Sequence, residues 1–335
     1  MQAPDFWYDA DASLPAAMLA PLAAAFDCAG RLNRWMTAPM PSPVPVICVG
    51  NLVAGGAGKT PTVIALARLL QVQGSTVHIL TRGYGGREGG PLLVDPKRHS
   101  TVDVGDEALL LARAAPTWVG ADRRVIAHRA ADAGASVTIM DDGFQNPSIK
   151  KNFSLIVVDG EVGLGNGRVI PAGPLREDPV RALARADAIL IMGEDRASVG
   201  AHLGRLARKQ IPHLGARLVP TADGARLAGS KVFAFAGIAR PEKFFASLRA
   251  AGCDVAGIRA FPDHYPFRAS DVAALKSAAE KAGARLVTTE KDHVRLHPDD
   301  ADAIATFAVE VAFDNPDRML ALLSPLLTKA VHGGI

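Results

Sequence analysis

At residues 50–61 the chain reads GNLVAGGAGKTP, between an apolar run at Val44–Val49 and a helix-like segment at Pro61–Gln73. Glycines let the backbone turn tightly, so that successive N–H groups point at phosphate oxygens, and the following helix adds its positive N-terminal dipole. In such a loop Lys59 reaches the β- and γ-phosphates, and the Thr60 hydroxyl binds Mg²⁺. The succession of strand, GxGKT and helix therefore predicts a phosphate-binding loop of the P-loop class. Its predicted phosphate contacts are Gly55, Gly56, Ala57, Gly58, Lys59, Thr60 and Pro61.

One position departs from the usual pattern G-x-x-x-x-G-K-[ST], which has glycine where this chain has Val53. A chance glycine-rich turn between a strand and a helix is the alternative interpretation. The order of strand, loop and helix favours phosphate binding, but it leaves open which reaction follows.

Short apolar runs recur along the chain, with helix-like stretches between them. Because these runs are uninterrupted, they indicate a parallel sheet covered by helices on both faces. A second, shorter series of strands and helices follows residues 215–229, which are rich in glycine, alanine and turn formers. We expect an α/β fold: a P-loop NTPase-like domain over residues 1–222 and a smaller α/β domain over residues 223–335. The expected strands of the first series are Val44–Val49, Thr76–Leu80, Ser136–Met140, Ser154–Val158 and Ala188–Met192.

Composition narrows the function classes. Of 335 residues, 49% are hydrophobic and 21% are charged, which suits a well-packed soluble protein, and the formal net charge of +3 is too small to argue for nucleic acid. The three cysteines, Cys28, Cys48 and Cys253, share no metal-ligand spacing, and we expect them as small core residues in a reducing compartment. No segment has the ~18 apolar residues of a membrane span. The protein is expected to be cytosolic, or attached to a membrane without crossing it.

The segment Leu14–Trp35 differs from the rest of the chain. Its apolar side chains fall near one helical face, and Arg31 and Arg34 lie at the far end. Two interpretations are open. The pattern alone favours a helix that caps the core. The alternative is an amphipathic helix in a membrane interface, with Trp7, Tyr8 and Trp35 near the headgroups.

Two acidic pairs are candidates for metal and proton chemistry. Asp141 and Asp142 end the strand Ser136–Met140, where an aspartate of a P-loop protein holds Mg²⁺. Paired aspartates are also common in turns, but the apolar strand before them favours the metal role. Asp106 and Glu107 precede a helix, so they are either an ordinary cap or a base for an attacking hydroxyl beside a metal ligand.

The second half contains two further polar motifs. Asp263 and His264 lie between prolines, and Thr288–Asp292 follows a predicted strand. A lone histidine in a loop is more often structural or solvated than catalytic, so spacing alone assigns neither motif a role.

Together these motifs resemble the tetraacyldisaccharide 4′-kinase (lipid A 4′-kinase) family of Gram-negative bacteria. That family also lacks the first glycine, at the position of Val53. Two positions depart from the family pattern: Ala108 stands where proline is usual, and Tyr265 where many members have a second histidine. The matching stretches, in the family's order, are VGN (49–51), GGAGKTP (55–61), TRGYG (81–85), GDE (105–107), DDGFQ (141–145), GNGR (165–168), PAGPLRE (171–177), FAGI (235–238), DH (263–264) and TTEKD (288–292).

The resemblance implies transfer of the γ-phosphate of ATP, with Mg²⁺, to the 4′-hydroxyl of tetraacyldisaccharide 1-phosphate, a lipid A precursor. It implies that Asp106 is the general base, that His264 tunes it, and that Lys59 neutralises the transferring group. The smaller domain would then close over the ATP site and bring Asp106 and His264 together. The other implied roles are Mg²⁺ binding by Thr60, Glu107 and Asp142 with the catalytic Asp141 close by, and lipid binding by Arg82 and Arg176.

A substrate with acyl chains changes the expectation for the N-terminal helix. We expect a peripheral protein at the cytoplasmic face of the inner membrane, acting as a monomer, with the lipid A precursor and the membrane surface as partners and without nucleic acid. The runner-up is a switch-type P-loop ATPase of the MinD-like or metallochaperone class, and a third class is a nucleotide sensor without turnover. The ATPase class gives no reason for PAGPLRE or for Asp263-His264, and a sensor has no need of a base.

Overall fold

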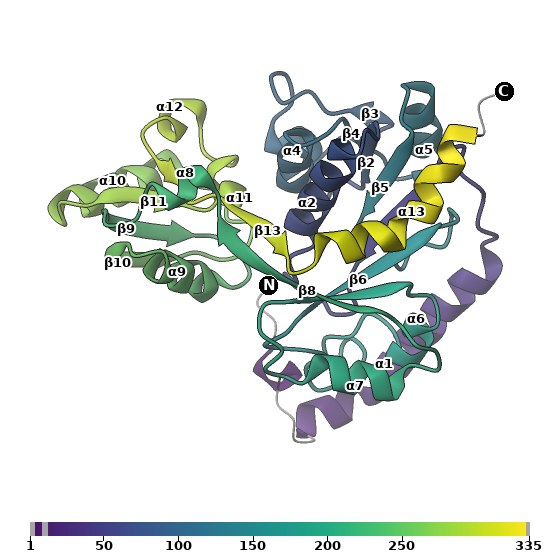
Figure 1. Cartoon of the computed structure of the whole chain (residues 1–335). Coiled ribbons are helices and arrows are strands. Elements are labelled where there is room, and N and C mark those ends of the chain that lie inside the picture. Colours follow the sequence, from purple (N-terminus) through teal and green to yellow (C-terminus); the bar gives the residue numbers. More distant parts are fainter. Residues whose placement is uncertain (1–3, 9–12, 333–335) are drawn as a thin grey trace.

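The computed structural model describes residues 4–8 and 13–332, and it shows two β-sheets side by side, each covered by helices (Figure 1). Within those residues the larger sheet has nine strands in the order β13-β8-β7-β6-β1-β5-β2-β4-β3. Neighbouring strands are parallel, except that β3 and β13 run antiparallel to β4 and β8. The strands are β1 Val46–Gly50, β2 Val77–Thr81, β3 Leu92–Leu93, β4 Thr117–Val119, β5 Val137–Asp141, β6 Phe153–Asp159, β7 Ala188–Met192, β8 His213–Pro220 and β13 Val309–Phe313.

Helices cover both faces of this sheet. Helices α2 (Lys59–Val72) and α13 (Pro316–His332) pack on one face, and α5 (Arg123–Asp132), α6 (Pro179–Leu183) and α7 (Val199–Leu206) pack on the other. Strands β1, β2 and β5 are buried at every position, as their uninterrupted apolar runs predict. The predicted α/β class is therefore confirmed. The remaining helices beside this sheet are α1 Leu14–Met36, α3 Thr101–Val104 and α4 Asp106–Ala112 with the short η1 Asp5–Trp7.

The smaller sheet has the order β10-β9-β11-β12 in the described part of the chain, and all its pairs are parallel. Helix α9 packs on one of its faces and α10 on the other. Its elements are α8 Ala222–Ala225, β9 Lys231–Ala236, α9 Pro241–Ala250, β10 Asp254–Ala260, α10 Ala269–Lys281, β11 Arg285–Thr288, α11 Glu290–His293, α12 Pro298–Ala301 and β12 Ala305–Thr306.

The chain returns from the smaller sheet to the larger one. We expected residues 223–335 to form the smaller unit, but β13 pairs with β8, and Met319 and Leu323 of α13 join the core of the large sheet. The small sheet is thus inserted between two antiparallel strands of the large one (Figure 1). The predicted ranges also include residues 1–3, 9–12 and 333–335, which lie outside the described residues.

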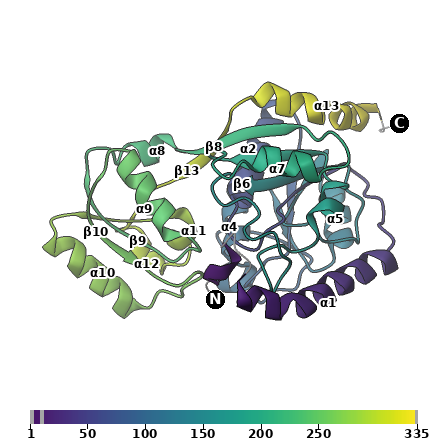
Figure 2. The ribbon, with the colours of Figure 1, turned by 90° about the horizontal axis from the view of Figure 1, so that it is seen from below.

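Helix α1 turns small side chains inward and large ones outward. Only Ala16 and Ala23 are buried, whereas Leu14, Leu22 and Trp35 are 74%, 60% and 82% exposed. The helix runs along the outside of the large sheet (Figure 2). Cys28 on this helix is exposed, so the expectation that every cysteine lies in the core is wrong for this one. None of the described helices is long and apolar enough to cross a membrane.

Candidate active site

The phosphate loop joins β1 to α2. Its turn depends on glycines, since Gly55 and Gly58 have φ values of +118° and +85°, which side chains disfavour. Among the described residues no protein acceptor receives a hydrogen bond from the backbone N–H groups of residues 55–60. Consecutive free N–H groups at the N-terminus of a helix form an anion-binding cradle. The loop is therefore built to hold phosphate.

Val53 has a packing role in place of the missing glycine. It is 8% exposed and bridges to Leu175 of the PAGPLRE segment, while the N–H of Ala54 donates to the carbonyl of Pro174 over 2.8 Å. The amide of Asn51 donates to the Val53 carbonyl over 2.6 Å. PAGPLRE thus supports the base of the phosphate loop.

Lys59 and Arg176 converge on one carboxylate. Lys59 Nζ lies 3.8 Å and Arg176 Nη1 2.7 Å from Asp142 Oδ1. Burial lowers the pKa of the Lys59 ammonium, and the Asp142 carboxylate opposes that shift. Asp142 itself has a φ of +48°, which turns its side chain out of the line of β5 toward these cations. Two positive charges therefore lie beside the loop where phosphate would add negative ones.

The neighbouring Asp141 is a buried carboxyl with an unsatisfied oxygen. It is 2% exposed, and its Oδ1 has no hydrogen-bond partner. Burial, together with the charges of Glu107 and Asp142, raises the pKa of Asp141 to about 8. In the described chain no three acidic, histidine or cysteine side chains form a metal site by themselves. The unpaired oxygen of Asp141 and the nearby carboxylates of Glu107 and Asp142 are the type of ligand that a hard cation such as Mg²⁺ takes.

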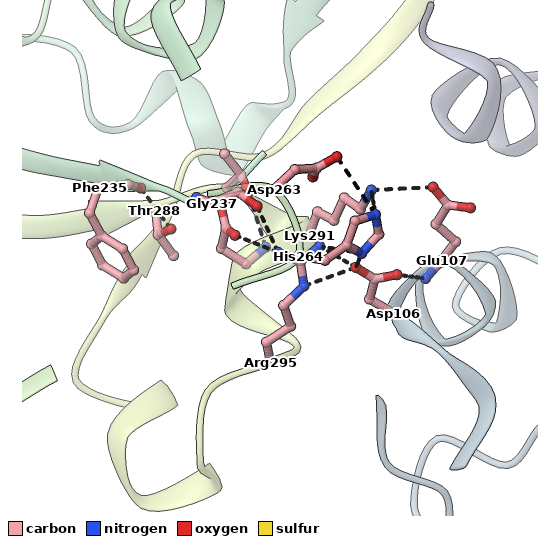
Figure 3. Close-up of polar contacts among 11 residues, drawn as sticks. Asp106, Glu107, Phe235, Gly237, Asp263, His264, Thr288, Lys291 and Arg295 are labelled. Atoms are coloured by element: carbon pink, nitrogen blue, oxygen red, sulfur yellow. Dashed lines mark hydrogen bonds and ion pairs between the residues drawn. The ribbon is translucent and has the colours of Figure 1, made fainter. Parts of the chain in front are cut away.

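Asp106 and His264 meet across the boundary between the two sheets (Figure 3). Asp106 is the first residue of α4 and 5% exposed, while His264 follows β10 in a left-handed conformation with φ +58°. His264 Nδ1 lies 3.1 Å from Asp106 Oδ2. Among the described residues the other oxygen, Oδ1, accepts only the N–H of Glu107, over 2.8 Å, so it keeps capacity for a second donor.

Two cations from α11 and the turn after it complete this cluster. Arg295 donates through Nε to Asp106 Oδ2 over 2.9 Å, and through Nη1 to the Gly237 carbonyl and to Asp292. Lys291 Nζ lies 3.3 Å from both Glu107 Oε1 and His264 Nε2. The His264 ring thus lies between the cations Lys291 and Arg295, each 3.3 Å from one of its nitrogens, and the carboxylate of Asp106.

The charges around Asp106 keep it ionised. Burial alone would raise the pKa of its carboxyl, but the hydrogen bond from His264 and the charges of Lys291 and Arg295 outweigh burial and hold that pKa well below its usual range. Sequence analysis missed Arg295 altogether. No spacing signal could reveal it, since an arginine after a short helix is ordinarily a surface residue.

The other residues that the sequence predicts for the site differ in their exposure and in their contacts. Thr60 and Pro61 are in the first turn of α2, and Glu107 is held by Lys291. Arg82, directly after β2, is exposed and has no ion pair within the described residues. Glu177 of PAGPLRE, which we had assigned no role, is 1% exposed and pairs with Arg185 and with Arg34 of α1. The ion pair between Glu177 and Arg34 connects helix α1 to the PAGPLRE segment, which supports the phosphate loop.

The chain is similar to known proteins over almost its whole length. The family model described as tetraacyldisaccharide-1-P 4′-kinase matches residues 15–328. Two relatives, each named tetraacyldisaccharide 4′-kinase, are similar over almost their whole length. The one from Rhodospirillum centenum is 51% identical over 338 residues, covering 99% of both chains, and the one from Paramagnetospirillum magneticum is 53% identical over 330 residues, covering 98% of both. A crystal structure of the "apo" form of LpxK from Aquifex aeolicus in complex with ATP shares the fold, with a TM-score of 0.74, 24% identity, and coverage of 93% of this chain and 99% of that one.

Proposed function

The chain belongs to the tetraacyldisaccharide-1-P 4′-kinase family, and on that premise we propose that it transfers the γ-phosphoryl group of ATP to the 4′-hydroxyl of tetraacyldisaccharide 1-phosphate. The observation that carries this proposal is the pairing of Asp106 with His264 beside a free phosphate-binding loop. A carboxylate held ionised within hydrogen-bond reach of an acceptor hydroxyl is what alcohol phosphorylation requires of a base.

The proposed step needs little covalent chemistry from the protein. As the O4′–P bond forms, the bond between the γ-phosphorus and the bridging oxygen of ADP breaks, and the hydroxyl proton passes to Asp106 Oδ1. Oδ2 is held by His264 and Arg295, so the carboxylate cannot rotate away. A weak base suffices, because the transition state is loose and the proton leaves late. Lys59 offsets the charge that gathers on the phosphoryl oxygens.

Mg²⁺ fits the remaining donors. The Thr60 hydroxyl, Glu107 and Asp142 would hold it, with Asp141 close by, and the orphaned Oδ1 of Asp141 marks a place for a cation or its water. A bound Mg²⁺ would draw the phosphate oxygens together and spread their charge.

The lipid half of the substrate is assigned to the side of the molecule that carries α1. Arg82 and Arg176 are the proposed partners of its anionic groups, since guanidinium groups suit phosphate. The exposed apolar side chains of α1 would lie in the bilayer surface, at the cytoplasmic face of the inner membrane.

Product analysis tests the position of transfer. The protein is incubated with ATP, Mg²⁺ and tetraacyldisaccharide 1-phosphate, and the lipid product is examined by ³¹P–¹H correlation. We expect a new phosphorus signal coupled to H4′, and none with Asp106→Asn. A product phosphorylated at another hydroxyl contradicts the proposal. ATP hydrolysis that is indifferent to the lipid would instead support a switch-type ATPase.

A further inference from the structure

A further buried carboxylate, that of Asp159, lies at the site and takes no part in the chemistry above. Asp159 ends β6, the neighbour of β1, and is 6% exposed. Both of its cationic partners among the described residues come from the smaller unit. Arg240 Nη2 donates to Oδ2, and Lys243 Nζ lies 2.8 Å from Oδ2 and 3.1 Å from Oδ1. Asp159 Oδ1 also accepts the N–H of Glu161 over 3.0 Å. A buried charge needs cationic partners, and those of Asp159 are present only while the smaller unit is in this position.

Arg240 also touches the phosphate loop itself. The same Nη2 that contacts Asp159 lies 3.2 Å from the carbonyl oxygen of Gly56. Arg240 immediately precedes α9, and it reaches the loop from the smaller sheet. Gly56 lies between the two positive-φ glycines, Gly55 and Gly58, where a backbone without side chains has the most freedom. A fixed donor on this carbonyl therefore removes freedom that the loop would otherwise have.

Because the peptide between Gly56 and Ala57 is planar, the contact of Arg240 with the Gly56 carbonyl also bears on ATP binding. The carbonyl of Gly56 and the N–H of Ala57 belong to one trans peptide and point in opposite directions. With the carbonyl held toward Arg240, the Ala57 N–H is held pointing away from Arg240. That N–H is one of the free donors of the phosphate cradle. Arg240 thus orients a phosphate-binding group that it does not itself touch.

We propose that Arg240 is a positioning residue for nucleotide binding, which fastens the smaller unit to the phosphate loop and orients the Ala57 N–H. This bridge and the Asp106–His264 cluster lie on opposite sides of β1. Asp159 belongs to β6 on one side, and α4 packs on β2 and β4 on the other. Residues of the smaller unit therefore contact the larger unit on both sides of the phosphate loop. The inference rests on the proposed use of ATP, but it concerns the nucleotide alone and not the acceptor.

A Lys243 variant distinguishes the two contacts of Arg240, which are the ion pair with Asp159 and the hydrogen bond to the Gly56 carbonyl. Lys243 pairs with Asp159 and, over 2.8 Å, with Glu161, but it makes no contact with the loop. Loss of Arg240 leaves Asp159 with one cation, so the fold should survive, whereas the loop loses its anchor. Loss of Lys243 weakens the bridge between the units and leaves the loop contact in place.

The test measures ATP affinity without lipid, by isothermal titration, and then the KM values for ATP and for the lipid. For Arg240→Met we expect binding of ATP to weaken about tenfold, the size of one lost hydrogen bond with a charged partner. KM for the lipid should not change, Arg240→Lys should recover part of the affinity, and Lys243→Met should have a smaller effect. Arg249→Met, at an exposed position in the last turn of the same helix, is the control and should bind ATP like the wild type.

If Arg240→Met binds ATP as tightly as the wild type and only its melting temperature is lowered, the inference is wrong. Arg240 then only stabilises the fold through its ion pair with Asp159. Equal increases in the KM values for ATP and lipid would also contradict the inference. If Arg240→Met does not fold, Arg240→Gln, which keeps a donor, takes its place and is expected to lie between methionine and wild type. Because ATP binding is measured without acceptor, these results do not depend on which hydroxyl is phosphorylated.

Discussion

At the scale of single residues, Asp106 shows how a buried carboxylate can remain ionised. Its main cationic partner, Arg295, lies 189 positions further along the chain and is itself 6% exposed. Removing one member of a buried ion pair leaves the other uncompensated, so these two residues act as a unit. Arg295 also holds the carbonyl of Gly237 and the buried Asp292, which fixes it to the smaller sheet.

Replacement of Arg295 should alter the pH dependence of catalysis. In Arg295→Met the pKa of Asp106 rises toward the value that burial favours, so the acid limb of kcat moves to higher pH. The loosened carboxylate should also lower kcat about 10- to 100-fold at neutral pH. Arg295→Lys is expected to restore the position of the acid limb more fully than the rate. A variant with a lower melting temperature but the wild-type pH profile would show that Arg295 only stabilises the fold.

His78 lies outside the candidate active site and should make the stability of the fold depend on pH. It lies in β2, is 4% exposed, and accepts the Trp118 Nε1–H over 3.2 Å, so burial lowers the pKa of its imidazole. The unfolded chain, with a pKa of about 6.5, then binds more protons than the native one as the pH falls. The contribution of His78 is therefore present above about pH 6.5 and is lost below it.

Chemical denaturation at pH 7 and pH 5 measures this loss. We expect a smaller decrease in the free energy of unfolding for His78→Gln, which can still accept from Trp118. His202→Gln, at an exposed position of α7, should keep the wild-type decrease. An equal decrease in all three proteins would contradict the assignment.

The sequence singled out most of the residues that the structure brings together, because strand ends and glycine loops carry local signals. Lys59, Asp141 and Asp106 each sit at a boundary between elements that the pattern revealed. Arg240 and Arg295 had no such signal. Their roles come from contacts made only when two distant parts of the chain meet.

At the scale of elements, α1 is the clearest departure from an ordinary surface helix. A helix that caps a core buries its large side chains, whereas this one buries two alanines and exposes leucines, Met18, Phe26 and Trp35. The sequence pattern predicted the helix but not its orientation, because periodicity marks an apolar face without saying what covers that face.

Charges placed on this face should weaken membrane binding. For Leu22→Glu combined with Phe26→Glu, we expect co-sedimentation with anionic liposomes to fall about tenfold or more, since two buried apolar side chains are lost from the interface. Val72→Glu, at an 81% exposed apolar position of α2, is the matched control and should bind like the wild type. Unchanged sedimentation of the double variant would refute a membrane role for α1.

At the scale of the whole molecule, the smaller sheet is an insertion held by β8 and β13 (Figure 1). Apolar runs predicted both sheets, but the return of β13 and α13 was not predicted, because an apolar strand does not reveal which sheet it will join. The arrangement places the small-sheet residues His264, Arg295 and Arg240 over the phosphate loop and α4. The groups proposed for catalysis come from both units and meet only when the units are joined, an arrangement that would keep water from the γ-phosphate.

Transfer of label from [γ-³²P]ATP to tetraacyldisaccharide 1-phosphate in mixed micelles, measured beside release of free phosphate, tests the account most directly. We predict that label appears in the lipid with little free phosphate, and that Lys59→Ala and Asp106→Asn each reduce the labelled lipid by at least about a hundredfold. Release of phosphate at the same rate with and without lipid, and no labelled lipid, would contradict a kinase and leave an ATPase that shares the family's fold.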